Sequence, residues 1–167
     1  MRAGPIAWLT GLPSSGKSTL ARAVAEVLRS KGVHTIVLDG DEVRDALRPR
    51  PGYDDDARDA FYETLARLAA LLAGQGATVL VPATAHLRTY RTRARALAPG
   101  RFVEIFVDTD LDTCRARDTK GLYARAAREG GGTLPGAGAV YEPPLVPELV
   151  VRPGDTHAIA RIVDAIT

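Results

Sequence analysis

Two kinds of hydrophobic pattern alternate along the chain. Short apolar runs that end at turn-forming residues predict buried strands at residues 6–10, 34–38, 77–83, 102–107 and 149–151. Apolar residues at helical spacing predict helices over residues 18–29, 54–74, 87–97, 111–117 and 156–166. Strands that alternate with helices favour parallel pairing through right-handed crossovers. The pattern therefore predicts an α/β fold, a three-layer sandwich around a parallel five-stranded sheet.

The length and composition of the chain narrow this prediction to one ordinary globular domain, residues 1–167. The sequence is 46% hydrophobic and 25% charged, which excludes a disordered or fibrous class. Cys114 is the only cysteine, so an intrachain disulfide and a cysteine-rich zinc site are excluded. No apolar run approaches the roughly 20 residues of a membrane helix. We expect a cytoplasmic protein that has no membrane partner.

The charges of the chain are nearly balanced but unusual in kind. The formal net charge is +2, and only Lys17, Lys31 and Lys120 among the 22 cationic residues are lysines. The excess of arginine has two interpretations, a general bias in composition or a cleft that needs planar donors for phosphate or sulfate oxygens. Acidic residues are interspersed throughout, and aromatic residues make up only 5%. This argues against nucleic-acid binding and favours a small anionic substrate.

A phosphate-binding loop follows the first predicted strand. Residues 11–19 read Gly-Leu-Pro-Ser-Ser-Gly-Lys-Ser-Thr, which is the complete G-x-x-x-x-G-K-[ST] pattern between a strand and a helix. In such a loop, successive backbone N–H groups converge on phosphate oxygens at the start of a helix. Lys17 is expected to reach the β- and γ-phosphates of ATP or GTP, and Ser18 to coordinate Mg²⁺. The predicted nucleotide-binding residues of the loop are Gly11, Ser14, Ser15, Gly16, Lys17, Ser18 and Thr19.

A catalytic carboxylate is expected after the second predicted strand, because the third ends without one. Asp41 stands where it can accept a hydroxyl proton or hold a Mg²⁺-bound water. The alternative interpretation of Asp41 is an N-cap for a short helix over residues 42–47. Asp39 is interpreted as mainly structural. Lys17 and Asp41 are therefore the predicted catalytic residues, and Ser18 and Asp41 the predicted metal site.

The sequence favours a kinase of small molecules over a P-loop NTPase switch or a binding module, since no Asn-Lys-x-Asp guanine motif is present. Residues 129–144 are rich in glycine and proline, and a loop of this length in a compact fold predicts a mobile lid. We place the lid at about residues 118–144. Both the switch and the binding module remain alternatives at this point.

Three further segments complete a resemblance to a known family. Residues 38–44 read Leu-Asp-Gly-Asp-Glu-Val-Arg, residues 102–109 read Phe-Val-Glu-Ile-Phe-Val-Asp-Thr, and residues 117–123 read Arg-Asp-Thr-Lys-Gly-Leu-Tyr. With the phosphate loop, these segments resemble adenylylsulfate (APS) kinase over nearly the whole chain. The resemblance implies a P-loop kinase that uses ATP and Mg²⁺ to phosphorylate the 3′-hydroxyl of APS, giving PAPS. Dimers are common in that family, so it also implies a homodimer.

The resemblance assigns roles to individual residues. It puts Asp41 beside the acceptor hydroxyl, Arg44 on the phosphosulfate of the acceptor, and Arg58 at a second acceptor-binding position. It puts Arg117 against the adenine of ATP and Lys120 in the lid.

The acceptor-binding motifs depart from the family pattern. Tyr53 and Leu134 each stand where the family has phenylalanine, and Phe61 replaces an asparagine. Tyr53 can still stack on a ring, but Phe61 cannot supply the hydrogen bonds of an amide, and Leu134 stacks less well on adenine. Ala85-His86-Leu87 replaces Ser-Pro-Tyr. The sequence thus leaves two alternatives open, a divergent APS kinase or a kinase for another nucleotide-like or anionic hydroxyl acceptor.

The residues that follow the third predicted strand carry two more open questions. His86 either contacts the acceptor or faces solvent at the entry of a helix. On that helix, Arg88, Arg91 and Arg95 share one face. One or two of these arginines are candidates for binding acceptor anions, and the others are expected on a solvated face.

Overall fold

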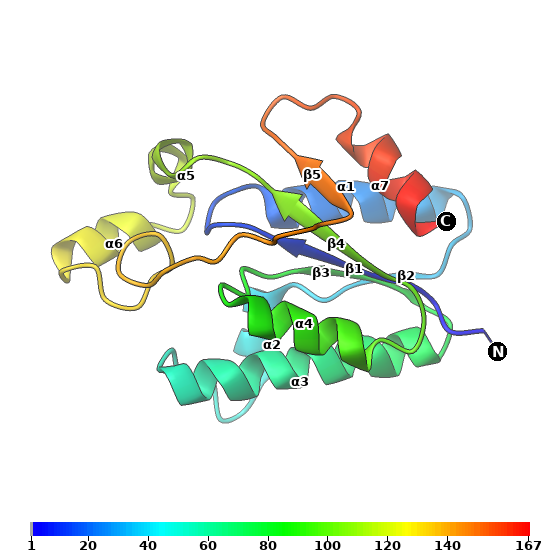
Figure 1. Ribbon diagram of the computed structural model, residues 1–167, viewed down its shortest axis with the longest axis horizontal. Coiled ribbons are helices and arrows are strands. Elements are labelled where there is room, and N and C mark those ends of the chain that lie inside the picture. Colours follow the sequence, from blue (N-terminus) through cyan, green and yellow to red (C-terminus); the bar gives the residue numbers. More distant parts are fainter. Residues whose placement is uncertain (1) are drawn as a thin grey trace.

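The computed structural model describes residues 2–167 and is built around a parallel sheet of five strands. The strands are β1 (Ile6–Thr10), β2 (Thr35–Val37), β3 (Thr78–Pro82), β4 (Phe102–Val107) and β5 (Leu149–Val151). Their order in the sheet is β2-β3-β1-β4-β5, and every adjacent pair is parallel (Figure 1). The predicted α/β sandwich with a parallel five-stranded sheet is confirmed.

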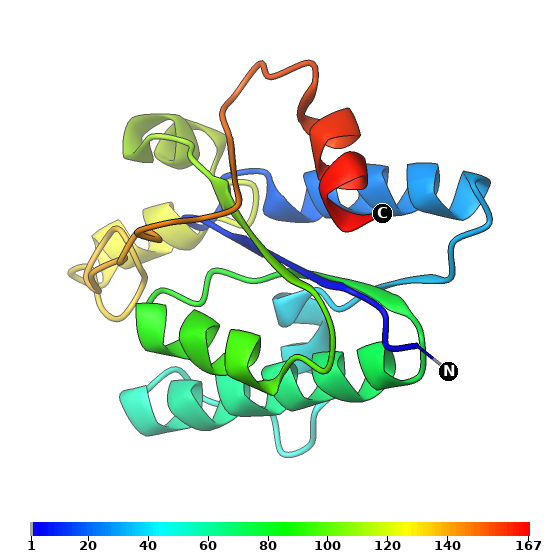
Figure 2. The same cartoon turned by 45° about the vertical axis from the view of Figure 1, so that its right-hand side comes forward.

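Helices cover both faces of the sheet. On one face lie α1 (Lys17–Ser30) and α7 (Ala158–Ile166), and on the other lie α2 (Gly40–Ala46), α3 (Asp55–Gly74) and α4 (Arg88–Leu97) (Figure 1). Two further helices, α5 (Leu111–Arg117) and α6 (Leu122–Arg128), gather with the loop after α6 at one end of the sheet (Figure 2). In residues 2–167, no helix is long and apolar enough to cross a membrane.

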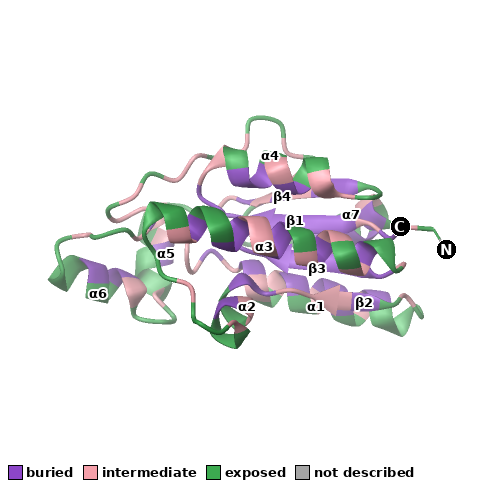
Figure 3. Cartoon of the chain, turned by 90° about the horizontal axis from the view of Figure 1, so that it is seen from below, coloured by how far each residue is buried: buried purple, intermediate pink, exposed green. Residues whose placement is uncertain are grey.

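The core explains why the central strands read as continuous apolar runs. All five residues of β1 are buried, and the first four alternate between two hydrophobic clusters. Ile6 and Trp8 pack toward α3 and α4, whereas Ala7 and Leu9 pack toward α1 and α7. A strand that is covered on both faces needs apolar residues at every position. Figure 3 shows the buried strands between helices whose outer faces are exposed.

Two short helices differ from the sequence prediction. Helix α2 is capped by Asp39, whose Oδ1 accepts the Asp41 backbone N–H at 3.0 Å. The interpretation of Asp41 as the cap is therefore wrong. Helix α6 was not predicted because no apolar periodicity marks it. It is organised instead by the Asp118 carboxylate, which accepts the backbone N–H groups of Tyr123 and Ala124, each at 3.0 Å.

The arginines of α4 all bind other protein groups, but they differ in their exposure to solvent. Arg91 is 2% exposed and donates to the Glu104 carboxylate and to the backbone oxygens of Ala85 and Glu142. The other three have the following partners: Arg88 binds the Pro143 carbonyl, Arg93 binds Asp59 and Glu63, and Arg95 binds Glu148. The expectation of a solvated face is wrong for Arg91, which is buried, whereas Arg95 is exposed as expected. These side chains tie α4 to distant parts of the chain.

Candidate active site

A cavity of about 1140 Å³ opens at the carboxyl ends of the strands, where ligands bind in open parallel sheets. The loop between β1 and α1 forms one wall, and the starts of α2 and α3 form another. The 118–144 segment contributes a third. Every one of the predicted site residues except Gly11 lines this cavity, namely Ser14, Ser15, Gly16, Lys17, Ser18, Thr19, Asp41, Arg44, Tyr53, Arg58, Arg117, Lys120 and Leu134.

The loop of residues 11–19 has the backbone that its glycines predict. Gly16 caps α1 with φ 101°, a left-handed conformation that side chains rarely adopt. At Gly11, a Cβ atom would lie 2.6 Å from the Val107 carbonyl oxygen, so only glycine allows β1 and β4 to leave the sheet side by side there. These two positions let the loop turn directly into the N-terminus of α1.

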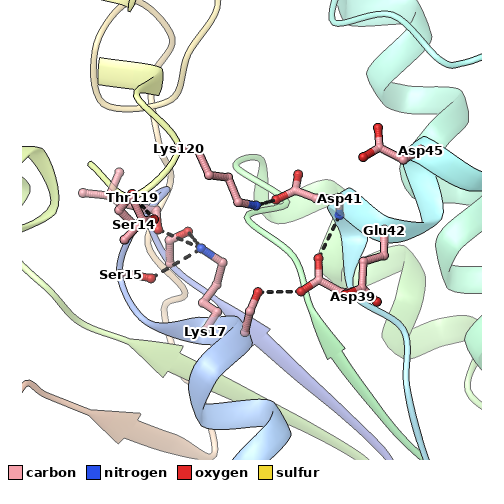
Figure 4. A network of polar contacts seen from close by, with 12 residues as sticks. Ser14, Ser15, Lys17, Asp39, Asp41, Glu42, Asp45, Thr119 and Lys120 are labelled. Atoms are coloured by element: carbon pink, nitrogen blue, oxygen red, sulfur yellow. Dashed lines mark hydrogen bonds and ion pairs between the residues drawn. The ribbon is translucent and has the colours of Figure 1, made fainter. Parts of the chain in front are cut away.

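Lys17 is folded over its own loop. Its Nζ donates to the carbonyl oxygens of Gly11 at 2.9 Å and Leu12 at 2.7 Å (Figure 4). Burial lowers the pKa of Lys17 to about 8, and the negative charge of Asp41 is the strongest effect in the opposite direction. The ammonium group thus has weak neutral partners, which anionic phosphate oxygens can replace with stronger charge-assisted hydrogen bonds.

Ser18 and Asp39 place two side-chain oxygens next to each other beside the loop. The Ser18 hydroxyl donates to Asp39 Oδ2 at 2.5 Å, and Asp39 is 4% exposed (Figure 4). A hydroxyl and a carboxylate are the hard oxygen donors that suit Mg²⁺. The structure therefore places Asp39, and not Asp41, next to Ser18. The sequence signal for this was present, since Asp39 directly follows the second predicted strand, but the sequence analysis interpreted Asp39 as mainly structural.

Asp41 faces the other side of the cavity and forms an ion pair with Lys120 (Figure 4). The two side chains come from α2 and from the 118–144 segment, and each is more than half exposed. Although burial acts against it, hydrogen bonding and the charge of Asp41 raise the pKa of Lys120. The pair joins that segment to the rest of the site.

The end of α5 and the start of the 118–144 segment also lie against the phosphate loop. The Arg117 guanidinium donates to the Ser15 carbonyl at 3.4 Å, and the hydroxyls of Ser14 and Thr119 are 3.4 Å apart. Leu134 lies further along and contributes to the cavity wall as a half-buried side chain.

On the side of the cavity formed by α2 and α3, an arginine is held between two aromatic rings. Arg44 is 4% exposed, and its guanidinium carbon lies 3.9 Å from the centre of the Phe61 ring and 4.4 Å from that of Tyr53. It also donates to the Gly52 carbonyl at 2.6 Å. Arg58 is buried nearby, 5.7 Å from the Tyr53 ring centre. Phe61 therefore provides a flat surface on which Arg44 packs, a role that the sequence comparison with an asparagine did not reveal.

The sequence left His86 undecided, and the structure places it in this cavity wall. It is 5% exposed, so its assignment to a solvent-facing position is wrong. Tyr62 is a neighbouring residue of the wall that the sequence analysis missed, because it forms part of an otherwise regular helical pattern.

Comparisons with known proteins agree with this geometry. The sequence profile of the family described as Adenylylsulphate kinase matches residues 3–152. The adenylyl-sulfate kinase of Burkholderia ambifaria is 40% identical over 152 residues, which cover 90% of this chain and 84% of that protein. The adenylyl-sulfate kinase of Geotalea uraniireducens is 41% identical over 165 residues, covering 95% of this chain and 78% of that protein.

Solved structures extend the similarity from sequence to fold. The APS kinase CysC of Mycobacterium tuberculosis, in complex with AMPPNP and APS, superposes with a TM-score of 0.93 at 36% identity and covers 98% of both chains. A hexameric APS kinase from Thiobacillus denitrificans superposes with a TM-score of 0.68 at 29% identity, over 99% of this chain and 28% of that one. The phosphate loop, the cavity and these matches have one explanation: the chain belongs to the adenylylsulphate kinase family.

Proposed function

We propose that the protein transfers the γ-phosphoryl group of ATP to the 3′-hydroxyl of adenylylsulfate and so forms PAPS. One observation carries this proposal: a single cavity joins a phosphate-binding loop to a pair of buried arginines, with Asp41 between them. The charge of Asp41 acts on the pKa of both Lys17 and Arg44, so this carboxylate lies within electrostatic reach of both ends. A phosphoryl donor and an anionic acceptor can therefore meet at Asp41.

The donor end would bind the triphosphate of ATP through the backbone N–H groups of residues 11–19. Lys17 would exchange its carbonyl partners for phosphate oxygens and stabilise the charge that shifts during transfer. Ser18 and Asp39 would hold Mg²⁺, which supplies charge neutralisation to the β- and γ-phosphates. Arg117 would lie at the adenine end of ATP, as the family resemblance implies.

Asp41 would act on the acceptor hydroxyl. The hydroxyl oxygen forms a bond to the γ-phosphorus, the bond from that phosphorus to the β-phosphate oxygen breaks, and ADP leaves. The proton of the hydroxyl passes to Asp41. For this step Asp41 must release Lys120, whose ammonium is then free to meet the anionic substrates. The 118–144 segment would thus serve as a lid whose position depends on the ligands.

The acceptor end would hold the phosphosulfate between Arg44 and Arg58. Tyr53 and Phe61 fix the plane of the Arg44 guanidinium, which favours a defined set of hydrogen bonds. A second candidate function keeps the same chemistry but takes another anionic hydroxyl acceptor. It is favoured by Leu134 and Phe61, which offer less stacking and less polar recognition to adenine than the family pattern does.

Assembly and location belong to the same proposal. The protein would work in the cytoplasm, where ATP is supplied and where Cys114 remains a reduced, buried thiol. A homodimer is expected from the family, and sedimentation of the purified protein measures the oligomeric state directly. A monomer at all concentrations would contradict this part of the proposal without affecting the proposed reaction.

The decisive experiment measures ADP release and PAPS formation with APS as the acceptor. Wild-type protein with ATP, Mg²⁺ and APS should form both products in equal amounts, and chelation of Mg²⁺ should stop the reaction. The matched controls omit APS or replace it with AMP, which lacks the sulfate. ADP release that needs no acceptor would indicate an NTPase instead. Turnover only with a different hydroxyl compound would establish the second candidate function.

A further inference from the structure

His86 is a buried polar side chain for which the protein supplies no partner. It is 5% exposed, and among residues 2–167 its ring nitrogens form no hydrogen bond. Trp8 Nε1 is the only side-chain polar atom of the described chain that is completely enclosed without a partner. The nitrogens of His86 are therefore not sealed in the core, and the residue lines the cavity. The hydrogen-bonding partner of these nitrogens must therefore come from the cavity, as ordered water or as a bound ligand.

The backbone around His86 is held firmly in place. Ala85 adopts φ 41°, its N–H donates to Tyr62 Oη at 3.1 Å, and its carbonyl accepts from Arg91. The His86 carbonyl accepts the Glu142 N–H at 2.8 Å. The His86 ring packs edge-to-face on Tyr90, with 5.5 Å between ring centres. The imidazole is thus positioned before any ligand arrives, which is typical of a group that selects a ligand.

The imidazole is also uncharged. Burial, assisted by the positive charge of Arg58, lowers the pKa of His86 to about 4, so the ring is neutral at neutral pH. A neutral imidazole offers one N–H donor and one nitrogen acceptor. Arg44 and Arg58 already provide the cations of this side of the cavity. His86 is therefore suited to a neutral polar group of the acceptor and not to its anionic part.

We propose that His86 is a specificity-determining residue that hydrogen-bonds a neutral polar group of the acceptor nucleoside, a base nitrogen or a sugar hydroxyl. The inference rests on the proposed function, since it assigns a residue to the same acceptor site. Phe61 removes an amide from this site, and His86 supplies a replacement hydrogen-bonding group in the lining of the same cavity. Recognition of the acceptor is redistributed in this chain and is not lost.

Two matched variants separate recognition from packing. His86→Phe keeps an aromatic ring against Tyr90 but removes both nitrogens, whereas His86→Gln keeps hydrogen-bonding capacity but removes the ring. Initial rates are measured with APS and with ATP as the varied substrate. For His86→Phe we expect the KM for APS to rise about tenfold, the size of one lost hydrogen bond of about 1.4 kcal/mol. Its KM for ATP and its kcat should stay within about twofold of wild type.

The Gln variant makes the test independent of folding. It should keep its KM for APS within about threefold of wild type, because an amide replaces the lost donor and acceptor. The opposite order, a harmless His86→Phe and a damaging His86→Gln, would show a packing role and overturn the inference. Failure of the proposed function has a different signature, since wild type itself would then form no PAPS from APS. Circular dichroism of both variants establishes that they are folded.

Discussion

The two ends of the cavity each bury a cation, and they satisfy it in different ways. At the donor end, Lys17 binds carbonyl oxygens of the same loop, five and six residues away. At the acceptor end, Arg44 binds the Gly52 carbonyl and lies between the rings of Tyr53 and Phe61, which belong to a loop and to α3. One site is built mainly from local backbone, and the other from side chains of several elements.

This difference explains which end of the cavity tolerates amino-acid substitutions. A loop that binds phosphate through backbone N–H groups depends on a few fixed residues, because its shape requires glycine where a Cβ would collide. A site built from side chains can exchange one group for another if a neighbour compensates. Phe61 illustrates this, since it lacks the polar atoms of an amide and yet packs against Arg44.

The largest effect is expected at the donor end. Lys17→Ala removes the ammonium that is proposed to stabilise the charge on the phosphate oxygens during transfer. We therefore expect kcat to fall by about 10²-fold to 10³-fold or more. Steady-state ADP release with saturating APS measures it. Lys31→Ala is the matched control, because Lys31 is an exposed lysine at the other end of α1. Near-normal turnover of Lys17→Ala would contradict the assignment of the donor end.

Asp41, between the two ends, should have the next largest effect. Asp41→Asn keeps the shape of the side chain but removes the charge and the proton acceptor, so kcat should fall by about 10²-fold with little change in ATP affinity. Glu42→Gln is the control, since Glu42 is the adjacent exposed carboxylate and pairs with Arg22 outside the cavity. Equal losses in the two variants would point to the general electrostatics of α2 and remove Asp41 from the proposed step.

The acceptor end offers a test of the aromatic support of Arg44. Phe61→Asn restores the amide of the family pattern but removes a ring face from a buried guanidinium. We expect the KM for APS to rise by about fivefold to tenfold, as for the loss of a cation–π contact of about 1 kcal/mol. Leu134→Phe, which adds stacking area without touching Arg44, should lower that KM by a few-fold. A lower KM for APS in Phe61→Asn alone would mean that an amide at this position matters more for APS binding than the ring that packs on Arg44.

The smallest effect is a pH dependence of stability at His86. Its pKa is lowered from 6.5 to about 4 in the folded chain, so the unfolded chain binds more protons between these values. The stability is fully present above pH 6.5 and decreases as the pH falls toward 4. Relative to His86→Phe, wild type should lose about 0.7 kcal/mol in the free energy of unfolding between pH 7 and pH 6.

Urea denaturation of both proteins at each pH measures this difference. The charged groups around His86, namely Arg58, Asp55, Glu142 and Arg91, are present in both proteins, so their own titration cancels. Parallel pH profiles for the two proteins would show that the imidazole titrates normally. In that case His86 would not be held neutral in the cavity wall.

The sequence by itself determined the five strands, most of the helices between them, the phosphate loop and the family. These features are encoded locally: strand and helix periodicity need only neighbouring residues, and the loop needs glycines at fixed positions. Even the resemblance at residues 117–123 was sufficient to place Lys120 near the site without knowledge of α6.

The tertiary structure alone decided how the side chains of the site are paired. Asp39 reaches Ser18 from 21 residues away, and Arg91 reaches Glu142 from 51 residues away. Such partners are brought together by the packing of α2 and α4 against the sheet, which no local pattern encodes. Whether an arginine is solvated, or a histidine is buried and neutral, depends on what distant segments place around it. Hydrophobic spacing therefore determined the fold here, and three-dimensional contacts determined the chemistry of the acceptor end.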